Sequence, residues 1–438
     1  MKVSFQTRLF VVLSVFALLC SIFTYQPKLT FAQGALDIQA EAVIMIEADS
    51  GKILFQKNQD TALPIASMTK MMTEYLVHEA VKQGKIKWDR KTTISEYAYE
   101  ISQDRQLSNV PLENQGTYTV QELYEAMAIY SANGATIALA ELIGGTEANF
   151  VKMMNAKAKE LGLTSAKFVN STGLTNEDLK GKGPLGENAT GENILSAKDC
   201  AVLARYLIKE YPDVLSTAAI PVKIFRENGK YPITMINWNK MLPGLGYTYT
   251  GVDGLKTGHT SAAGYCFTGT AEQNGMRLIT VVMKTNSEAA RFAETKKLLD
   301  YGFTTYEVKE LYPAGYQLKG KKTISVPKGK DKEVSIATKK AVVVPVPIGV
   351  KNPYKVSYKL NKKELEAPTK KETKVGYMII KSTEADDAGF VSGSELKTEV
   401  VTKKSVEKAN WFILMFRGIG SFFGGLWSSA VDAIKGIF

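Results

Sequence analysis

The sequence is poor in the residues that build disulfide frameworks and metal centres. Its 438 residues include three cysteines and two histidines. Cys20 lies in an N-terminal apolar run, which leaves Cys200 and Cys266, and two isolated cysteines make no disulfide framework. We expect two buried thiols, with pairing as the alternative. A histidine-rich metal centre built on His78 and His259 is not expected, and nothing in the sequence implies a cofactor.

The N-terminus has a short apolar run rather than a membrane-spanning one. Residues 9–23 are apolar but too few for a membrane span, and the basic residues Lys2 and Arg8 precede them. Small residues then stand at the −3 and −1 positions of a cleavage site after Ala32. We therefore predict a secretory signal over residues 1–32, with an uncleaved N-terminal anchor as the alternative.

The chain carries an excess of positive charge, with a net charge of +11 and a pI near 9.1. Much of the excess is lysine after residue 318, in stretches such as 319–322 and 328–332. Aromatic residues do not interleave these lysines as they would on a nucleic-acid platform, so we expect no nucleic-acid partner. A solvated surface with a mild attraction to anionic lipid or wall polymer is the better interpretation.

The C-terminal segment, residues 411–438, has the spacing of an amphipathic helix. Arg417 and Asp432 fall on its polar face and disfavour a membrane-spanning position. We predict a helix that lies in the interface of an anionic membrane, with a packing helix of the folded domain as the alternative. The apolar face is formed by Phe412, Phe416, Ile419, Phe423, Leu426, Ala430, Ala433 and Ile437.

Between the two ends, the pattern predicts a mixed α/β layer with a largely antiparallel sheet. Apolar runs at residues 42–48 and 52–57 flank the turn Asp49-Ser50-Gly51 and indicate a hairpin. Residues 170–193 are rich in Gly and Asn and lack periodicity, so we expect a long surface loop near a functional site. Helical patterns cover 67–83, 120–128, 135–143, 147–161, 197–210 and 291–301, and strand patterns cover 265–271 and 277–283.

Past residue 311 the sequence changes to short β-rich runs separated by turns, which is typical of a small, separate β domain. No catalytic constellation is evident there. We therefore expect four parts: a signal peptide (1–32), a catalytic α/β domain (33–310), a β-rich domain (311–401), and a linker with the amphipathic helix (402–438).

Three short motifs occur in order, and together they supply the parts of a serine acyl-transfer site. They are Ser67-Met68-Thr69-Lys70, Ser131-Ala132-Asn133 and Lys256-Thr257-Gly258. The second and third occur once each. The first pattern, Ser-x-x-Lys, recurs at Ser325, Ser394 and Ser405, so by itself it is weak.

The first motif pairs a nucleophile with a base. Ser67 follows Pro64 closely and is expected near a helix N-terminus, with Lys70 on the same face one turn later. An ordinary lysine is protonated at neutral pH, but burial and a second cation both lower its pKa. Lys256 is a candidate for that second cation. Taken in isolation, the motif is better explained by an N-cap serine before an exposed lysine.

The other two motifs offer groups that bind a substrate. Ser131 can relay a proton and Asn133 can hold an amide, although Ser, Asn and Gly also suit a plain turn between helices. The third motif is expected to precede a strand, where Lys256 and Thr257 offer a cation and a hydroxyl to a carboxylate. Gly258 would let a substrate backbone approach closely, with an edge-strand turn as the alternative.

His259 and Asp253 invite a Ser-His-Asp triad with Ser67, but the lysine mechanism is better supported. His259 follows Gly258 directly. Its backbone N–H is therefore more useful as an oxyanion donor than its ring is as a base.

The ordered set of motifs resembles that of penicillin-binding proteins and serine β-lactamases. The surrounding residues resemble the low-molecular-mass D-alanyl-D-alanine carboxypeptidases more closely, in three segments: residues 64–70, 251–260 and 296–299. The likeness covers about residues 35–310 and continues more weakly through the β-rich part. It implies a penicillin-binding transpeptidase-like domain with an antiparallel sheet flanked by helices, a small all-β domain and a terminal anchor.

The resemblance also implies roles for the first two motifs. Ser67 would form an acyl-enzyme on the penultimate D-alanine and expel the terminal one. Lys70 would be its general base, Ser131 would assist proton transfer, and Asn133 would bind the substrate. Gly134 departs from the family pattern, in which many members have Asp after the Asn, and this puts the stability of the local turn in question.

The third motif would then hold the terminal carboxylate of the substrate through Lys256 and Thr257, beside Gly258. The backbone of His259 would complete an oxyanion hole with that of Ser67. Arg291 resembles a family arginine that helps to hold the carboxylate.

The expected function is a serine-type carboxypeptidase that acts on peptidoglycan stem peptides ending in D-Ala-D-Ala and is acylated by β-lactams. A β-lactamase is an alternative, although no Glu-x-x-Leu-Asn segment follows the second motif to supply a deacylating glutamate. A penicillin-sensing or wall-binding module that acylates without turnover is another.

Overall fold

The structure is a computed structural model that describes residues 36–184, 186, 191–384 and 387–417. The predicted signal peptide and most of the predicted C-terminal amphipathic helix lie outside these residues. Within the described residues, no helix combines the length and the apolar character that crossing a bilayer requires.

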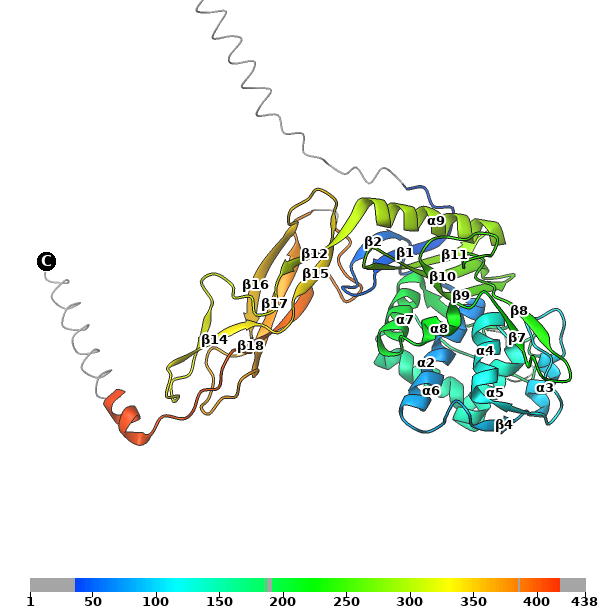
Figure 1. The fold of residues 1–438 in the computed structure, drawn as a ribbon, viewed down its shortest axis with the longest axis horizontal. Coiled ribbons are helices and arrows are strands. Elements are labelled where there is room, and N and C mark those ends of the chain that lie inside the picture. Colours follow the sequence, from blue (N-terminus) through cyan, green and yellow to red (C-terminus); the bar gives the residue numbers. More distant parts are fainter. Residues whose placement is uncertain (1–35, 185, 187–190, 385–386, 418–438) are drawn as a thin grey trace, which may run out of the picture. The chain divides into compact units, whose positions relative to one another are not determined.

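The larger part of the chain is built on a five-stranded antiparallel sheet with the strand order β2-β1-β11-β10-β9 (Figure 1). The predicted hairpin around Asp49-Ser50-Gly51 supplies β2 and β1, and a second hairpin supplies β10 and β11. The strands are β1 (Ala42–Glu47), β2 (Ile53–Lys57), β9 (Val252–Thr260), β10 (Gly264–Gln273) and β11 (Met276–Thr285). This arrangement confirms the mixed helix and sheet fold.

Helices cover both faces of this sheet because its central strands are apolar on both sides. Ile44 of β1 belongs to the core that also contains residues of α7, whereas Met45 contacts Gly302 of α9. Strand residues point alternately to opposite faces, so a central strand covered on both sides must be apolar throughout. β1 is buried along its whole length for this reason.

A second core lies among helices that pack beside the sheet, around buried residues such as Leu123, Met127 and Ile137. Side chains satisfy the free N–H groups at several helix starts, as in the Thr119–Glu122 capping box of α4. The helices are α2 (Lys70–Lys82), α3 (Glu96–Ser102), α4 (Val120–Tyr130), α5 (Asn133–Gly144), α6 (Glu147–Glu160), α7 (Ala197–Glu210), α8 (Val214–Ala218) and α9 (Glu288–Thr305). Three two-stranded pairs complete this part: β3 (Ala62–Pro64) with β6 (Ile194–Ser196), β4 (Lys91–Thr93) with β5 (Thr117–Thr119), and β7 (Val222–Phe225) with β8 (Ile233–Ile236).

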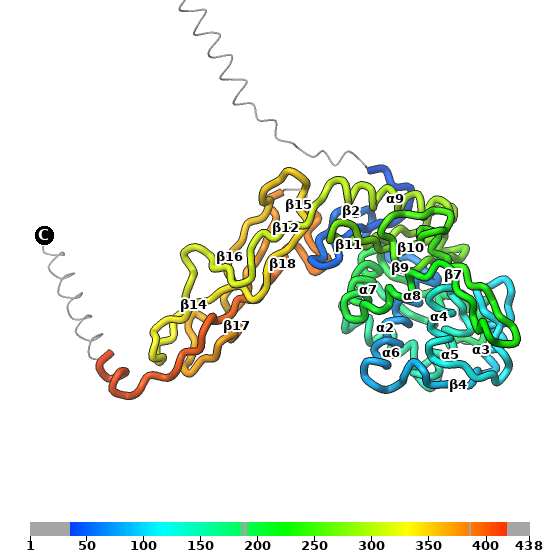
Figure 2. The backbone as a smooth tube through the Cα atoms, viewed as in Figure 1, coloured from blue at the N-terminus to red at the C-terminus, as the bar shows by residue number. Residues whose placement is uncertain are grey.

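After α9 the chain forms the β-rich part that the sequence predicts, as the backbone trace in Figure 2 shows. Its core contains Val334, Val344 and Met378, among other buried apolar residues. One sheet has the order β13 (Thr323–Ser325), β14 (Glu333–Thr338), β18 (Leu396–Thr402), β17 (Lys374–Ser382) and β16 (Tyr354–Leu360), and β12 (Tyr306–Tyr312) pairs with β15 (Val342–Pro347).

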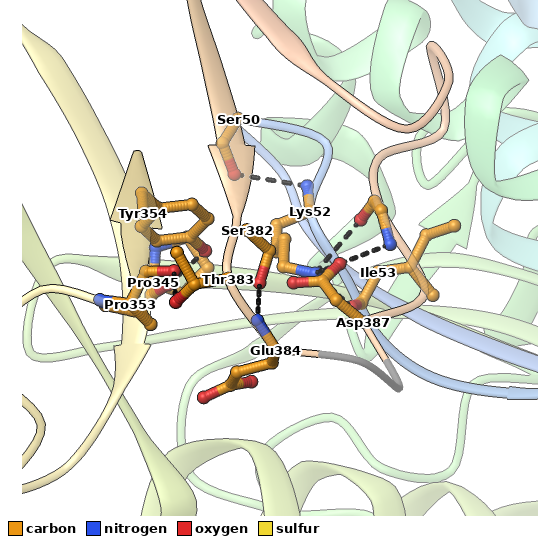
Figure 3. Close-up of polar contacts among 11 residues, drawn as sticks. Ser50, Lys52, Ile53, Pro345, Pro353, Tyr354, Ser382, Thr383, Glu384 and Asp387 are labelled. Carbon is orange, nitrogen blue, oxygen red and sulfur yellow. Dashed lines mark hydrogen bonds and ion pairs between the residues drawn. The ribbon is translucent and has the colours of Figure 1, made fainter. Parts of the chain in front are cut away.

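A segment that follows β17 returns to the β1–β2 hairpin (Figure 3). Lys52 forms a buried ion pair with Asp387 at 2.5 Å and donates to the carbonyl of Gly389. The backbone joins as well, because Ile53 N–H donates to Gly389 O and Val391 N–H donates to Gly51 O. The contact therefore combines a desolvated charge pair with main-chain hydrogen bonds.

The first turns of the C-terminal helix are described over residues 411–417. Trp411, Phe412 and Phe416 are exposed there. Arg417 donates from its guanidinium to the carbonyls of Gly329 and Lys330, in the turn before β14.

Candidate active site

Ser67 lies in a short 3-10 turn, η1 (Ala66–Thr69), which runs directly into α2. The serine is therefore near a helix start, as the spacing predicts. Its side chain is half-buried, whereas Ala66, Met68 and Thr69 around it are buried. The turn thus holds a reactive hydroxyl at the edge of a packed core.

Lys70 is fully buried and reaches back to the serine. Its ammonium donates to Ser67 Oγ at 3.0 Å, to Asn133 Oδ1 at 2.8 Å and to the carbonyl of Thr172 at 2.7 Å. Burial holds the pKa of Lys70 well below its usual value of 10.5, and the charge of Lys256 lowers it further. A lysine with a lowered pKa releases its proton more readily than an ordinary lysine and, once neutral, can accept one from the serine.

The second motif connects α4 to α5. Ser131 ends α4 in the left-handed conformation, with φ of 61°, and its buried Oγ has no hydrogen-bond partner in the described part of the chain. Asn133 begins α5, and both its backbone N–H and its Nδ2 donate to Ser108 O at 3.0 Å. These bonds turn Oδ1 of Asn133 toward Lys70. An unpaired buried hydroxyl costs free energy, so Ser131 is a group in need of a partner.

The third motif lies within β9, and the expectation that it precedes a strand was wrong. Gly258 is where β9 passes closest to η1, since a Cβ atom there would be 2.5 Å from the carbonyl oxygen of Ile65. The glycine therefore admits the backbone beside Ser67, and its expected role in admitting a substrate backbone stays a prediction. Because Gly258 has no side chain, β9 and η1 can lie in contact.

Lys256 is buried beneath this contact, with its ammonium 3.2 Å from the carbonyl of Thr257. Burial lowers the pKa of Lys256 from 10.5 to about 7, a shift that Glu74 opposes and Arg291 increases. Thr257 is buried beside it. The structure thus brings the lysine of the third motif close enough to Lys70 for the two charges to interact.

Arg291 and His259 flank the same stretch of β9. The buried Arg291 donates from Nη1 to Gly258 O at 3.4 Å, and its Nε has no partner among the described residues. The His259 ring is exposed and lies 4.1 Å from the ring of Tyr265, centroid to centroid. Asp253 binds Arg277 through both carboxylate oxygens at 2.8 Å, so it is not available for a triad with His259 and Ser67.

With this geometry, comparison with known proteins gives the family. The sequence model of D-alanyl-D-alanine carboxypeptidases matches residues 29–287, more than half of the chain. The chain belongs to the D-alanyl-D-alanine carboxypeptidase family. The model of the C-terminal domain of penicillin-binding protein 5 matches residues 306–408, over the β-rich part.

Individual relatives of this carboxypeptidase agree over most of their length. The chain is 34% identical to D-alanyl-D-alanine carboxypeptidase DacF of Bacillus subtilis over 383 residues, which is 87% of this chain and 90% of the relative. A solved structure of a peptidoglycan synthesis regulatory factor (PBP3) from Streptococcus pneumoniae is 37% identical, with a TM-score of 0.73 over 85% of this chain and 100% of that one. Penicillin binding protein 5 from Haemophilus influenzae is 29% identical, with a TM-score of 0.70 over 85% of this chain and 98% of that one.

The carboxypeptidase site also depends on residues that the motifs do not reveal. We expected a surface loop over residues 170–193, but Asn170, Thr172 and Asn193 are buried beside the nucleophile turn. Asn170 Oδ1 accepts from the N–H groups of Thr172 and Gly173, and Asn193 Nδ2 donates to Thr69 Oγ1. Residues 170–174 are buried because side chains of the loop satisfy the loop backbone there. This loop presents the Thr172 carbonyl to Lys70. In the sequence, the only sign of this role is that the loop is rich in Asn and Gly.

Gly173 packs directly against the nucleophile turn, and its replacement is expected to disrupt the site. Its φ is +84°, and a Cβ atom would be 1.9 Å from the carbonyl oxygen of Ala66. We expect Gly173→Ala to lower the free energy of unfolding by about 1–3 kcal/mol and to displace Ser67. Denaturant unfolding and acylation by a fluorescent penicillin would measure the two effects.

Gly162 is a matched control, because its φ is +74° but nothing lies within 4 Å of a Cβ atom there. Gly162→Ala should therefore carry only the backbone strain of about 1 kcal/mol and leave acylation intact. Equal acylation by the two variants would show that Gly173 does not support the nucleophile turn.

Gly134 has a different role from the one expected. It lies in the first turn of α5 rather than in the connecting turn, and a Cβ atom would be 2.6 Å from Ser102 Cβ and 2.7 Å from Ala98 O, on α3. The absence of the family Asp at this position therefore goes with a close approach of α3 to α5.

Proposed function

We propose that the chain is a serine-type D-alanyl-D-alanine carboxypeptidase that removes the terminal D-alanine from peptidoglycan stem peptides through an acyl-enzyme on Ser67. The observation that carries the proposal is the 3.0 Å hydrogen bond between Ser67 Oγ and a fully buried lysine whose pKa is held well below its usual value. The family of the chain and its relative DacF are both named for D-alanyl-D-alanine carboxypeptidase activity, and this supports a D-Ala-D-Ala peptide as the substrate.

In this proposal, neutral Lys70 accepts the proton of Ser67 while Oγ attacks the carbonyl carbon of the penultimate D-alanine. The tetrahedral intermediate collapses, the peptide bond breaks, and the leaving amine takes up a proton that Ser131 passes on from Lys70. D-Alanine departs and leaves an ester on Ser67. A water molecule then attacks the ester carbonyl while Lys70 takes its proton. The bond between the acyl carbon and Ser67 Oγ breaks, Lys70 returns the proton to Oγ, and the shortened peptide leaves as a carboxylic acid that loses its proton to solvent. The unpaired Oγ of Ser131 suits such a relay.

Binding of the substrate is assigned to the cations around β9. Lys256 and Thr257, with Gly258 beside them, would hold the terminal carboxylate, and Arg291 would add positive charge behind them. A carboxylate would thereby gain charge-assisted hydrogen bonds inside a desolvated site. Asn133 would hold the substrate amide. The backbone N–H groups of Ser67 and His259 would stabilise the oxyanion.

β-Lactams would acylate the same serine. Like the D-Ala-D-Ala peptide they present an amide carbonyl near a carboxylate, and in a β-lactam that amide is strained. The Haemophilus influenzae relative is named penicillin binding protein 5. Labelling of Ser67 by penicillin therefore does not separate a carboxypeptidase from a β-lactamase or a penicillin sensor. Turnover does.

The deciding experiment supplies the purified protein with a diacylated tripeptide that ends in D-Ala-D-Ala and measures free D-alanine. We expect catalytic release. Rapid hydrolysis of penicillin in its place would establish a β-lactamase, and acylation with neither reaction would establish a sensor or wall-binding module.

We further propose that the protein is exported and held at the outer face of the bacterial membrane by residues 411–438. The exposed aromatic residues Trp411, Phe412 and Phe416 support this placement, as does the lysine-rich surface before them. Removal of residues 411–438 is expected to abolish sedimentation with anionic vesicles while D-alanine release stays within about twofold of the full chain. Continued sedimentation of the truncated protein would contradict the anchor.

A further inference from the structure

Helix α2 places a second ionisable group directly behind the proposed base. Lys70, Glu74 and His78 are spaced four residues apart and therefore share one face of the helix. All three are buried, with exposed fractions of 0%, 4% and 8%. The proposed mechanism uses Lys70 alone. Buried carboxylates are rare unless something in the protein compensates their charge, so Glu74 calls for an explanation.

Glu74 is held at the end of a short hydrogen-bond chain. The Tyr124 hydroxyl on α4 lies 3.5 Å from Glu74 Oε2 and 2.9 Å from His78 Nε2. Burial lowers the pKa of His78 to about 4, so the ring is neutral at neutral pH and carries one N–H. If Nε2–H donates to the Tyr124 oxygen, the Tyr124 proton is free for Glu74. The ring of Trp88 packs edge-on against His78, at 5.2 Å between centroids.

The charges around Glu74 do not balance without it. Lys70 and Lys256 are both buried, and in the described part of the chain neither forms an ion pair with a carboxylate. The charge of Glu74 favours the protonated form of both lysines, but not equally. It is the largest charge effect on Lys256, whereas on Lys70 both burial and the charge of Lys256 outweigh it. One buried anion can compensate one buried cation, but not two. The proposed reaction requires the two lysines to differ in charge. Lys70 must be neutral to act as the base, and Lys256 must be positive to hold a carboxylate.

We propose that Glu74 is a positioning residue for this reaction: its buried carboxylate, held by Tyr124 and His78 behind Lys70, keeps Lys256 positively charged for substrate binding while Lys70 stays free to act as the base. The inference rests on the proposed carboxypeptidase function and adds a group that does not touch the substrate.

The groups that face Glu74 all belong to this account. They are Lys70 and His78 on α2, Tyr124 on α4 and Lys256 on β9, with Arg291 of α9 acting on Lys256. Burial raises the pKa of Glu74 to about 7, and Lys256, Tyr124 and Lys70 each oppose that rise. The carboxylate therefore ionises in the neutral range, as Lys256 does.

The test measures kcat and KM against pH for wild type, Glu74→Gln and Glu74→Asp, with the D-Ala-D-Ala peptide and with the same peptide as a terminal carboxamide. Loss of the carboxylate charge lowers the pKa of both lysines. For Glu74→Gln we expect both limbs of the pH profile to move to lower pH by about one unit or more. KM for the carboxylate peptide should rise about tenfold at neutral pH, with a smaller change in kcat and little change for the carboxamide. Glu74→Asp keeps the charge and should restore most of the profile.

Tyr124→Phe is the second variant, because it keeps the carboxylate and removes its hydrogen-bond donor. It should move the limbs in the same direction by a smaller amount, and thermal unfolding would check that each variant is folded. An unmoved pH profile, with equal loss on the carboxylate and carboxamide peptides, would overturn the inference and leave Glu74 a purely structural residue. If wild type itself releases no D-alanine, the proposed function fails instead.

Discussion

Ser67→Ala is expected to abolish the release of D-alanine, with a fall of at least about 10⁴-fold in kcat, because the acyl-enzyme can no longer form. The hydroxyl is a single atom at the edge of a packed turn, so its removal should leave the fold unchanged. The measurement is D-alanine release from the diacylated tripeptide, accompanied by labelling with a fluorescent penicillin, which should also disappear.

The sequence offers a matched control for this variant. Ser394 begins another Ser-x-x-Lys string, but it is exposed in the β-rich part of the chain. Ser394→Ala should retain full activity and full labelling. Stoichiometric labelling of the Ser67→Ala protein, or loss of activity in the Ser394→Ala protein, would contradict the assignment of the nucleophile.

Lys70→Met is expected to slow acylation by about 10²–10⁴-fold, the usual contribution of a positioned general base. Methionine fills much of the volume of the buried lysine but cannot accept the serine proton. The wild-type acylation rate should rise with pH through the lowered pKa of Lys70, because only the neutral amine is a base. The Lys70→Met variant should lose this rise. The rate constant of penicillin acylation, measured across pH by stopped flow, tests both statements.

Lys70→Arg separates the charge of this residue from its basicity. A guanidinium keeps the positive charge and the hydrogen-bonding capacity but stays protonated at all accessible pH values. It should therefore be as slow as Lys70→Met. Near wild-type acylation by the arginine variant would mean that position 70 contributes charge alone, and another group would have to be the base.

Local elements were predictable wherever a single periodicity ran undisturbed. The apolar alternation around Asp49-Ser50-Gly51 gives the β1–β2 hairpin, and the helical spacing after Pro64 gives α2. The third motif was misplaced because a glycine within a strand reads locally as a turn. Gly258 is there for its contact with Ile65, which is distant in sequence.

The buried loop at residues 170–174 shows the same limit. A polar stretch with little periodicity is typical of the surface. Asn170 and Asn193 reverse that expectation, because their side chains satisfy the loop backbone and Thr69. The partner of Asn170 in this pair of bonds is Gly173, close in sequence, but Asn193 reaches Thr69, which is far away along the chain. No local pattern therefore distinguishes this loop from an exposed one.

The sequence by itself determined which chemical groups are present and in what order, and hence the family. The order of the motifs singles out Ser67 among four Ser-x-x-Lys strings, but spacing alone could not show which of the four lysines is desolvated. The lysines of the other three, Lys328, Lys397 and Lys408, are exposed, whereas Lys70 is buried against Asn133, Thr172 and the charge of Lys256. Only the tertiary structure decided this, because a lysine becomes a base through desolvation and neighbouring charge, and both come from residues far away along the chain.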